Sequence, residues 1–223
     1  RDNFTLNKET SIRKRLLQNS LMLNRKGLNH GATGNLSCRN DNGFIITPSG
    51  VSLENLDSNS MVEIGFNGEI INSKSNYKPS SEWLFHRDIY AAKDDIHAIV
   101  HTHSVFSSTL SVIGESIPPF HYMIAVAGGD SIRCSDYALF GSQELSNNII
   151  IAMEQRKACL ISNHGMIAIG KDLNEAINIA IEVEHLAQVY VQAKMIGTPK
   201  LLNDNQMLEV IDKFKNYGEW SKD

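Results

Sequence analysis

Two histidines separated by a single residue, His101 and His103, end an apolar segment that starts at Ile96. In an extended chain, residues i and i+2 project from the same face, so both imidazoles leave this predicted strand together. Paired imidazoles suit a borderline metal such as zinc, which a third nitrogen and a carboxylate bring to four-coordination. An exposed strand end would show the same pattern. If the pair binds metal, the fold must bring the other ligands to this strand end.

Two further residues are candidates for those ligands. His164 follows a second apolar run, residues 158–163, and Glu82 lies in the first turn of a helix that Ser80 or Ser81 would cap. Three neutral histidines would leave a bound ion Lewis-acidic, with room for an oxygen substrate. Glu82 also has a simpler interpretation, because an acid in the first turn complements the helix dipole.

Three short segments offer hydroxyls and free backbone N–H groups: residues 31–35 (Gly-Ala-Thr-Gly-Asn), residues 47–50 (Thr-Pro-Ser-Gly), and the two serines before Glu82. The start of a helix is a ready anion site, so together they suggest a phosphate cradle. Taken separately, such loops are usually only turns. Because neither a P-loop nor a GxGxxG motif is present, we do not expect a nucleotide.

The remaining histidines receive plainer interpretations. His97 shares the strand face of the His-x-His pair, and we expect a core position or a supporting role near the ligands. His86 and His185 fall inside predicted helices, where satisfied or exposed histidines are common. His30 and His121 are candidate pocket residues.

The length and composition of the 223 residues are typical of one globular domain. The net charge of −4 and the pI near 6.1 argue against a nucleic-acid partner, and residues 13–15 (Arg-Lys-Arg) are expected on the solvated face of the first helix. No apolar stretch is long enough to cross a membrane, and no secretory signal is visible. Cys38, Cys134 and Cys159 are widely spaced, which favours structural thiols in the cytoplasm.

Sequence periodicity predicts antiparallel hairpins first and alternating helices and strands later, which indicates an α/β or α+β fold with a mixed sheet layered by helices. Hairpin turns are expected at residues 41–43 and 67–68, and Asp172 opens a capping box with Glu175. The expected helices are residues 9–26, 80–92, 104–112, 142–156, 172–196 and 204–217. The expected later strands are residues 96–103, 158–163 and 166–170.

Six motifs occur in an order that resembles the class II aldolase/adducin family, and the similarity runs from about residue 8 to Trp220. The motifs are Gly34-Asn-Leu-Ser37, Thr47-Pro-Ser-Gly50, Ser80-Ser-Glu82, His101-Thr-His103, His121-Tyr-Met123 and Asn163-His-Gly165. The resemblance implies one domain over residues 1–223, an α/β/α sandwich around a central, largely antiparallel sheet. It also implies a homotetramer of fourfold (C4) symmetry with active sites between subunits.

The resemblance also implies a set of ligands. One Zn²⁺ per subunit would be held by His101, His103 and His164, with Glu82 as fourth ligand. The substrate phosphate would be held by Asn35, Ser49, Gly50, Ser80 and Ser81. The family has Thr-Ala after the loop glycine, whereas this chain has Ala32-Thr33, so the contact of Thr33 with the phosphate is in doubt.

The implied activity is metal-dependent cleavage of a ketose 1-phosphate, L-fuculose 1-phosphate or a relative, to dihydroxyacetone phosphate and L-lactaldehyde. Zinc would stabilise the enediolate, and Glu82 would leave the metal and act as general acid and base. Tyr122 would reach a neighbouring subunit and exchange a proton with the aldehyde oxygen. Phe140, Phe214 and Tyr217 would wall the aldehyde side, and residues 204–223 would form a mobile lid.

Other branches of the family stay open. L-ribulose-5-phosphate 4-epimerases typically carry Asp in place of Glu82 and a catalytic tyrosine elsewhere, so Glu82 with Tyr122 favours an aldolase. A methylthioribulose-1-phosphate dehydratase, a phosphotetronate decarboxylase and a 5-deoxypentulose-1-phosphate aldolase are further alternatives. A non-enzymatic adducin-like module is disfavoured because the metal ligand set is intact.

Overall fold

One eight-stranded sheet forms the centre of the molecule in a computed structural model that describes residues 3–72 and 75–215. The strand order is β4-β3-β2-β1-β5-β8-β7-β6, and every neighbouring pair is antiparallel except β6 with β7. The strands are β1 (Asn35–Asn40), β2 (Gly43–Ile46), β3 (Val62–Gly65), β4 (Ile70–Asn72), β5 (Ala98–Thr102), β6 (Cys134–Ser135), β7 (Ala158–Ile161) and β8 (Gly165–Gly170). The expected largely antiparallel sheet is confirmed.

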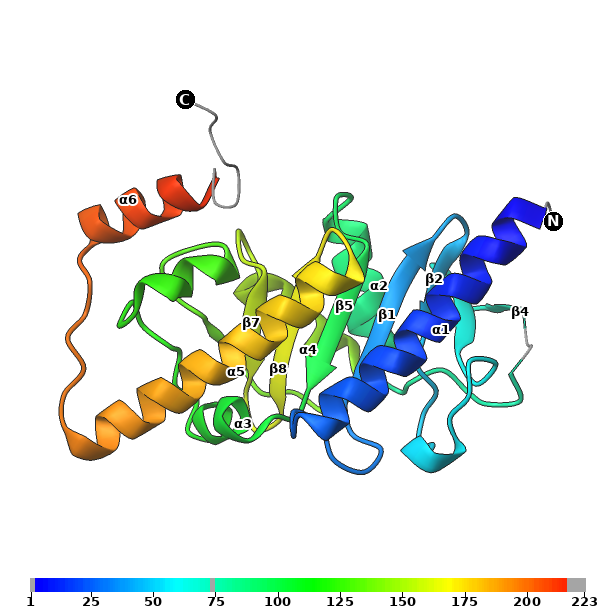
Figure 1. The fold of residues 1–223 in the computed structure, drawn as a ribbon, viewed down its shortest axis with the longest axis horizontal. Helices are drawn as coiled ribbons and strands as arrows, with labels where there is room; N and C mark the ends of the chain where they lie inside the picture. Colours follow the sequence, from blue (N-terminus) through cyan, green and yellow to red (C-terminus); the bar gives the residue numbers. More distant parts are fainter. Residues whose placement is uncertain (1–2, 73–74, 216–223) are drawn as a thin grey trace.

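Helices cover both faces of the sheet and make three layers (Figure 1). One face carries α1 (Asn3–Arg25), α3 (Val105–Val112) and α5 (Leu173–Ile196), and the other carries α2 (Trp83–Ala92) and α4 (Gln143–Ala152). Strand alternation divides the core between them: on β5, Val100 packs on the α1/α5 face and Ile99 on the α2/α4 face. The α/β/α sandwich predicted from the sequence is therefore confirmed.

The remaining helices lie at the edges of the sandwich. A short 3-10 helix, η1 (Leu53–Asn55), follows β2, and a second, η2 (Tyr122–Ala127), follows α3. The last helix, α6 (Asp204–Lys215), contacts η2 at the end of the molecule far from the N-terminus (Figure 1). Sequence periodicity predicted α6, but not η2 or the short strand β6.

Two expectations about charged and polar side chains were wrong. Arg13 is buried, and its guanidinium donates to the Met61 carbonyl, so residues 13–15 do not all lie on a solvated face. His97 is exposed and precedes β5 instead of sharing its buried face. In both cases, local spacing could not specify where tertiary packing would place the helix or where the strand would begin.

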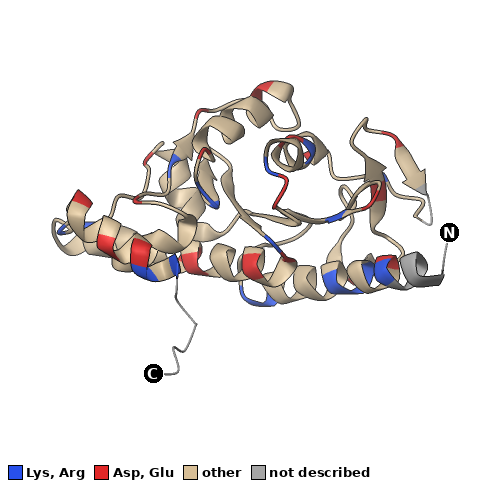
Figure 2. Cartoon of the chain, turned by 90° about the horizontal axis from the view of Figure 1, so that it is seen from above, with Lys and Arg blue, Asp and Glu red and all other residues tan. Residues whose placement is uncertain are grey.

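Acidic and basic residues are interspersed along the elements of the fold (Figure 2). Blue segments along α1 mark its Lys and Arg residues, while red segments appear on α5 and α6. Among the described residues, no helix is both long enough and apolar enough to span a membrane.

Candidate active site

The three histidines of the predicted metal site converge with Glu82. His101 is the penultimate residue of β5, which is buried throughout, His103 lies just beyond this strand, and His164 immediately precedes β8. Because β5 and β8 are paired, these positions lie at one end of the sheet. The Nε2 atom of His101 is 3.0 Å from that of His103 and 3.2 Å from Glu82 Oε2, and His164 Nε2 is 3.1 Å from Glu82 Oε1.

The spacing of these atoms fits a four-coordinate ion. The four potential ligand atoms all lie within 4.8 Å of one another. For a metal–nitrogen distance of about 2.0–2.1 Å, neighbouring donors of a tetrahedron lie about 3.3 Å apart, close to the separations found here. Glu82 Oε1 is buried and has no well-oriented hydrogen-bond donor among the described residues, as expected for an atom that has a cation as partner. These residues therefore fit a metal of the zinc type.

Hydrogen bonding and charge put the ligands in the states that bind metal. The Met166 carbonyl lies 2.9 Å from His101 Nδ1 and can only accept, so the proton is on Nδ1 and Nε2 is the free donor atom. Burial acts to raise the pKa of Glu82, but the imidazoles of His101 and His164 outweigh it and hold this pKa well below its usual range. Burial, with help from its histidine neighbours, lowers the pKa of His103 to about 3.

Backbone contacts hold the outer two histidines in place. The backbone N–H of His103 donates to the side-chain oxygen of buried Asn29 at 3.0 Å, and that of His164 donates to Ser111 Oγ at 3.3 Å. Asn163 has a φ of +55°, in the left-handed region that asparagine tolerates better than most residues. This conformation turns the chain sharply between β7 and β8 and presents His164 to the cluster.

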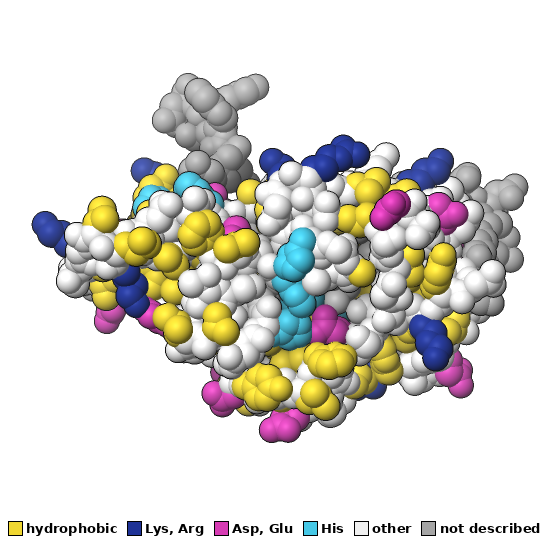
Figure 3. Space-filling model, turned by 90° about the horizontal axis from the view of Figure 1, so that it is seen from below, with side chains coloured by type: hydrophobic (Ala, Val, Ile, Leu, Met, Phe, Trp, Pro, Cys, Tyr) yellow, Lys and Arg dark blue, Asp and Glu magenta, His cyan; other side chains and the backbone are white. Residues whose placement is uncertain are grey.

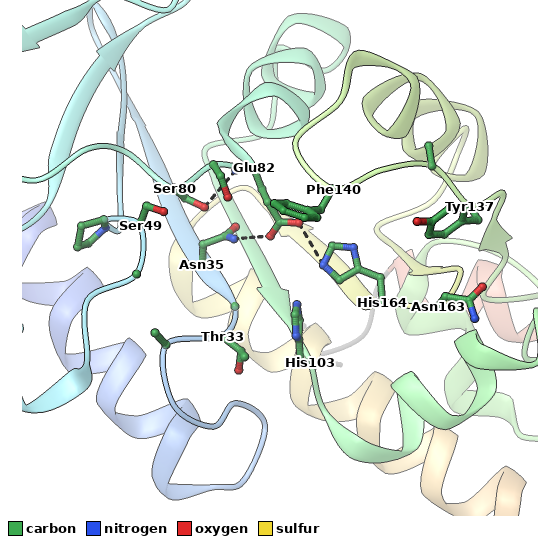
Figure 4. Close-up of a pocket in the computed structure, with 16 residues that line it drawn as sticks. Thr33, Asn35, Ser49, Ser80, Glu82, His103, Tyr137, Phe140, Asn163 and His164 are labelled. Atoms are coloured by element: carbon green, nitrogen blue, oxygen red, sulfur yellow. Dashed lines mark hydrogen bonds and ion pairs between the residues drawn. The ribbon is translucent and has the colours of Figure 1, made fainter.

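A cavity of about 420 Å³ opens beside the cluster and is lined by the predicted phosphate-binding segments (Figure 4). Ser49 N–H donates to the Lys78 carbonyl and Ser80 N–H to the Thr47 carbonyl, so the 47–50 loop runs alongside the start of α2. The cavity wall includes Thr33, Asn35, Ser49, Gly50, Ser80 and Ser81, as well as Glu82, His103 and His164. The segments that sequence spacing only suggested as a cradle thus meet in one place.

Two details of this wall differ from the sequence interpretation. Glu82 is the N-cap residue of α2 and not part of its first turn, and its N–H donates to Ser80 Oγ at 3.3 Å. Thr33 Oγ1 donates to the His30 carbonyl at 2.6 Å, so its proton is engaged inside the loop. Thr33 therefore lines the cavity without a free hydroxyl donor for an anion.

Of the described residues expected at the aldehyde side, Phe140 lines the cavity, whereas Tyr122 and Phe214 do not. Tyr122 is half-exposed on η2 and is absent from the cavity wall of its own chain. Phe214 on α6 packs against the α1/α5-face core. Tyr217 lies outside the described residues.

Sequence reasoning missed several contributors to this site. Tyr137 shares the cavity wall with Phe140, Asn29 anchors His103, and His86 contacts Asn35 behind the cavity. Figure 3 shows histidine side chains gathered at the centre of one face, with hydrophobic side chains clustered beside them. Each of these roles depends on contacts between distant segments, so no local pattern signalled them.

Comparisons with known proteins agree with this geometry. Residues 14–191 match the family model described as the Class II Aldolase and Adducin N-terminal domain. The 5-methylthioribulose-1-phosphate/5-deoxyribulose-1-phosphate aldolase of Rhodospirillum rubrum is 46% identical over 209 residues, which cover 94% of this chain and 93% of that protein. The L-fuculose phosphate aldolase of Escherichia coli is 42% identical over 208 residues, which cover 93% and 95%.

A solved structure of an L-fuculose 1-phosphate aldolase has a TM-score of 0.88 to this fold at 37% sequence identity. The match covers 92% of this chain and 96% of that one. Fold, metal-ligand cluster and sequence similarity thus agree over almost the whole chain. This protein belongs to the class II aldolase and adducin family and is an aldolase, a carbon–carbon lyase.

Proposed function

We propose that this aldolase is zinc-dependent and reversibly cleaves L-fuculose 1-phosphate, or a closely related ketose 1-phosphate, to dihydroxyacetone phosphate and an aldehyde. The observation that carries the proposal is the convergence of Glu82, His101, His103 and His164 at a cavity that also has a hydroxyl-rich wall. A phosphate at that wall would bring the carbonyl end of a three-carbon fragment toward the cluster.

The phosphate-binding role is assigned to Asn35, Ser49, Gly50, Ser80 and Ser81. They offer side-chain and backbone donors beside the N-terminus of α2, where the helix dipole favours an anion. Gly50 has a φ of +65°, so the backbone turns tightly there, in a conformation that side chains disfavour. Thr33 contributes least, because its hydroxyl proton is donated to His30.

His101, His103 and His164 would hold the zinc, with Glu82 as fourth ligand before substrate binds. The bound ion supplies Lewis acidity for the charge that develops when the C3–C4 bond breaks. Glu82 moves the proton at C3: it delivers the proton when dihydroxyacetone phosphate forms and removes it in the reverse direction. Its low pKa keeps it ionised, as a metal ligand and a proton acceptor must be, and its hydrogen bond from Asn35 orients it.

Tyr122 is proposed to serve the cavity of a neighbouring subunit, where it exchanges a proton with the aldehyde oxygen. Its exposure and its position outside the cavity of its own chain support this assignment. The assignment requires an oligomer, for which we propose a homotetramer with C4 symmetry. Phe140, Phe214 and Tyr217 would enclose the aldehyde, with residues 204–223 as a mobile lid of this single domain. The free cysteines are consistent with the cytoplasmic location that we propose for this enzyme.

A second substrate is favoured by one specific observation. The Rhodospirillum rubrum relative, whose name specifies 5-methylthioribulose and 5-deoxyribulose 1-phosphates, shares 46% identity with this chain. Tyr137 and Phe140 give the cavity an aromatic rim that would accept the apolar end of either kind of substrate. Cleavage of 5-deoxyribulose 1-phosphate would yield acetaldehyde in place of lactaldehyde.

The testing experiment is a coupled assay for dihydroxyacetone phosphate released from L-fuculose 1-phosphate. It is run on the purified enzyme, after EDTA treatment, and after zinc is restored. We expect release that EDTA abolishes and zinc restores. If the metal-loaded enzyme is inactive on L-fuculose 1-phosphate but cleaves 5-deoxyribulose 1-phosphate, the second compound becomes the proposed substrate. Activity that survives complete metal removal would contradict the proposal.

A further inference from the structure

A chain of hydrogen bonds runs behind Glu82, between β1 and α2. Asn35 Nδ2 donates to Glu82 Oε2 at 2.8 Å, and Asn35 Oδ1 meets His86 Nε2. On the other side of the ring, His86 Nδ1 lies 2.7 Å from Ser37 Oγ, which lies 2.8 Å from the Tyr90 hydroxyl. All five side chains are buried, and those of Ser37, His86 and Tyr90 are fully inaccessible.

The carboxylate at one end determines the direction of every bond. An ionised Glu82 only accepts, so the amide nitrogen of Asn35 faces it and the amide oxygen faces His86. His86 Nε2 must therefore carry the proton, which leaves Nδ1 as an acceptor. Ser37 uses its single proton for Nδ1 and must in turn accept from Tyr90.

The opposite direction of hydrogen bonding along this chain is disfavoured, because it would place two acceptors against each other. With the proton on Nδ1, His86 Nε2 would need a donor, and the Asn35 amide would have to flip. Its oxygen would then face Glu82 Oε2 at hydrogen-bond distance, with an acceptor against an acceptor. This arrangement requires a neutral His86 imidazole. Burial, which has the larger effect, and the nearby His101 lower the pKa of His86 to about 3.

We propose that His86 is a positioning residue whose Nε2–H fixes the Asn35 amide, so that Asn35 orients the Glu82 carboxylate and presents its second N–H to the substrate. Register supports this arrangement, because Asn35 is paired with His101 across β1 and β5 and lines the cavity. The catalytic part of the inference depends on the proposed aldolase reaction. The proton arrangement does not depend on any substrate.

The proton arrangement is tested by NMR of the zinc-loaded enzyme labelled with ¹⁵N-histidine. The His86 signals are identified by their absence from the His86→Gln variant. We expect an unprotonated Nδ1 and a protonated Nε2 that do not titrate across the neutral range. A proton on Nδ1, or a His86 ring that becomes charged near neutral pH, would overturn the inference even if no substrate had been found.

The positioning role is tested by comparing His86→Gln with His86→Leu. A glutamine can keep an N–H directed at Asn35, whereas leucine fills space and donates nothing. For His86→Leu we expect kcat or zinc affinity to fall by about 10- to 100-fold, the usual effect of losing a group that supports a metal ligand. His86→Gln should recover most of that loss. Equal losses in the two variants would mean that His86 only fills the core.

Ser37→Ala provides an independent test, because it removes the donor to Nδ1 without changing Asn35 or Glu82. Its matched control is Ser146→Ala, which also removes a fully buried hydroxyl, one that donates to Asp88 where α2 contacts α4. We expect Ser37→Ala to shift the NMR signals of His86 and lower kcat, while Ser146→Ala changes neither. Unchanged His86 signals in Ser37→Ala would contradict the deduced direction of the chain.

Discussion

The two ends of the cavity are built in different ways. At the metal end, His101 is fully buried and each ligand is held by contacts from the same chain. At the aldehyde end, Tyr137 and Phe140 are 62% and 63% exposed. Tyr122 and Phe214 lie elsewhere on the molecule. One chain therefore brings together the proposed metal ligands and the proposed phosphate-binding segments. For the aldehyde end, our proposal invokes a neighbouring chain and movement of the C-terminal segment.

The largest expected effect is at the metal end. His103→Ala removes one of three imidazole ligands, so we expect loss of bound zinc and a fall in cleavage rate of roughly a thousandfold or more. Metal analysis and the coupled assay measure both quantities, with exposed His97→Ala as control. Near-normal activity in His103→Ala would show that the metal end is wrongly assigned.

A mixing experiment tests whether the aldehyde end comes from a second chain. Tyr122→Phe should slow cleavage by about a hundredfold, within the range of general acid–base catalysis, and should slow proton exchange on dihydroxyacetone phosphate much less. Tetramers that combine Tyr122→Phe chains with His103→Ala chains should regain part of the activity, because an intact metal end can meet an intact tyrosine. Absence of any recovery in confirmed mixed tetramers would place Tyr122 in its own chain's site or outside catalysis.

The buried polar chain at the metal end predicts a pH dependence of stability. The pKa of His86 is lowered from 6.5 to about 3, so between these values the unfolded chain binds a proton that the folded chain excludes. The free energy of unfolding should therefore rise with pH in this window, and His86 should contribute roughly 1.4 kcal/mol per pH unit. Urea unfolding of wild type and His86→Gln at one protein concentration measures the difference in slope, with exposed His185→Gln as control. If the free energy of unfolding depended on pH with the same slope in wild type and His86→Gln, the predicted contribution of His86 would be disproved.

Smaller effects are expected at the aromatic rim. Phe140→Ala should raise KM for the ketose phosphate by about tenfold, in the range of lost apolar contacts in substrate pockets. Proton exchange on dihydroxyacetone phosphate, which lacks the aldehyde portion, should change little. If exchange and cleavage were impaired equally, Phe140 would support the metal end instead of the aldehyde end.

Thr33→Val is expected to have the smallest effect. The hydroxyl already donates to the His30 carbonyl, so its removal should change KM by less than about threefold, which corresponds to well under 1 kcal/mol. Inhibition by inorganic phosphate gives a second measure of the same site. Ser81→Ala is the contrasting variant, and we expect a clear loss of phosphate affinity from it.

The contrast between the two ends also explains what the sequence could predict. Alternation around His101 and the apolar run before His164 are local patterns; they located the strands correctly and singled out three histidines that the fold brings together. The burial of Arg13 and the link between His86 and Asn35 depend on how distant segments pack, which periodicity does not specify. The location of Tyr122 relative to a cavity depends in addition on which chains assemble.

Glu82, His86 and Tyr90 are spaced four residues apart and share one face of α2 and its N-cap. A single inserted residue within this stretch would rotate everything after it by about 100° around the helix axis. Glu82, its proposed positioning residue His86 and Tyr90 would then no longer lie on one face of the helix. Homologous genes should therefore accumulate substitutions along α2 but almost no insertions or deletions between these positions, whereas the exposed hairpin turn at Asn67 and Gly68 can change in length.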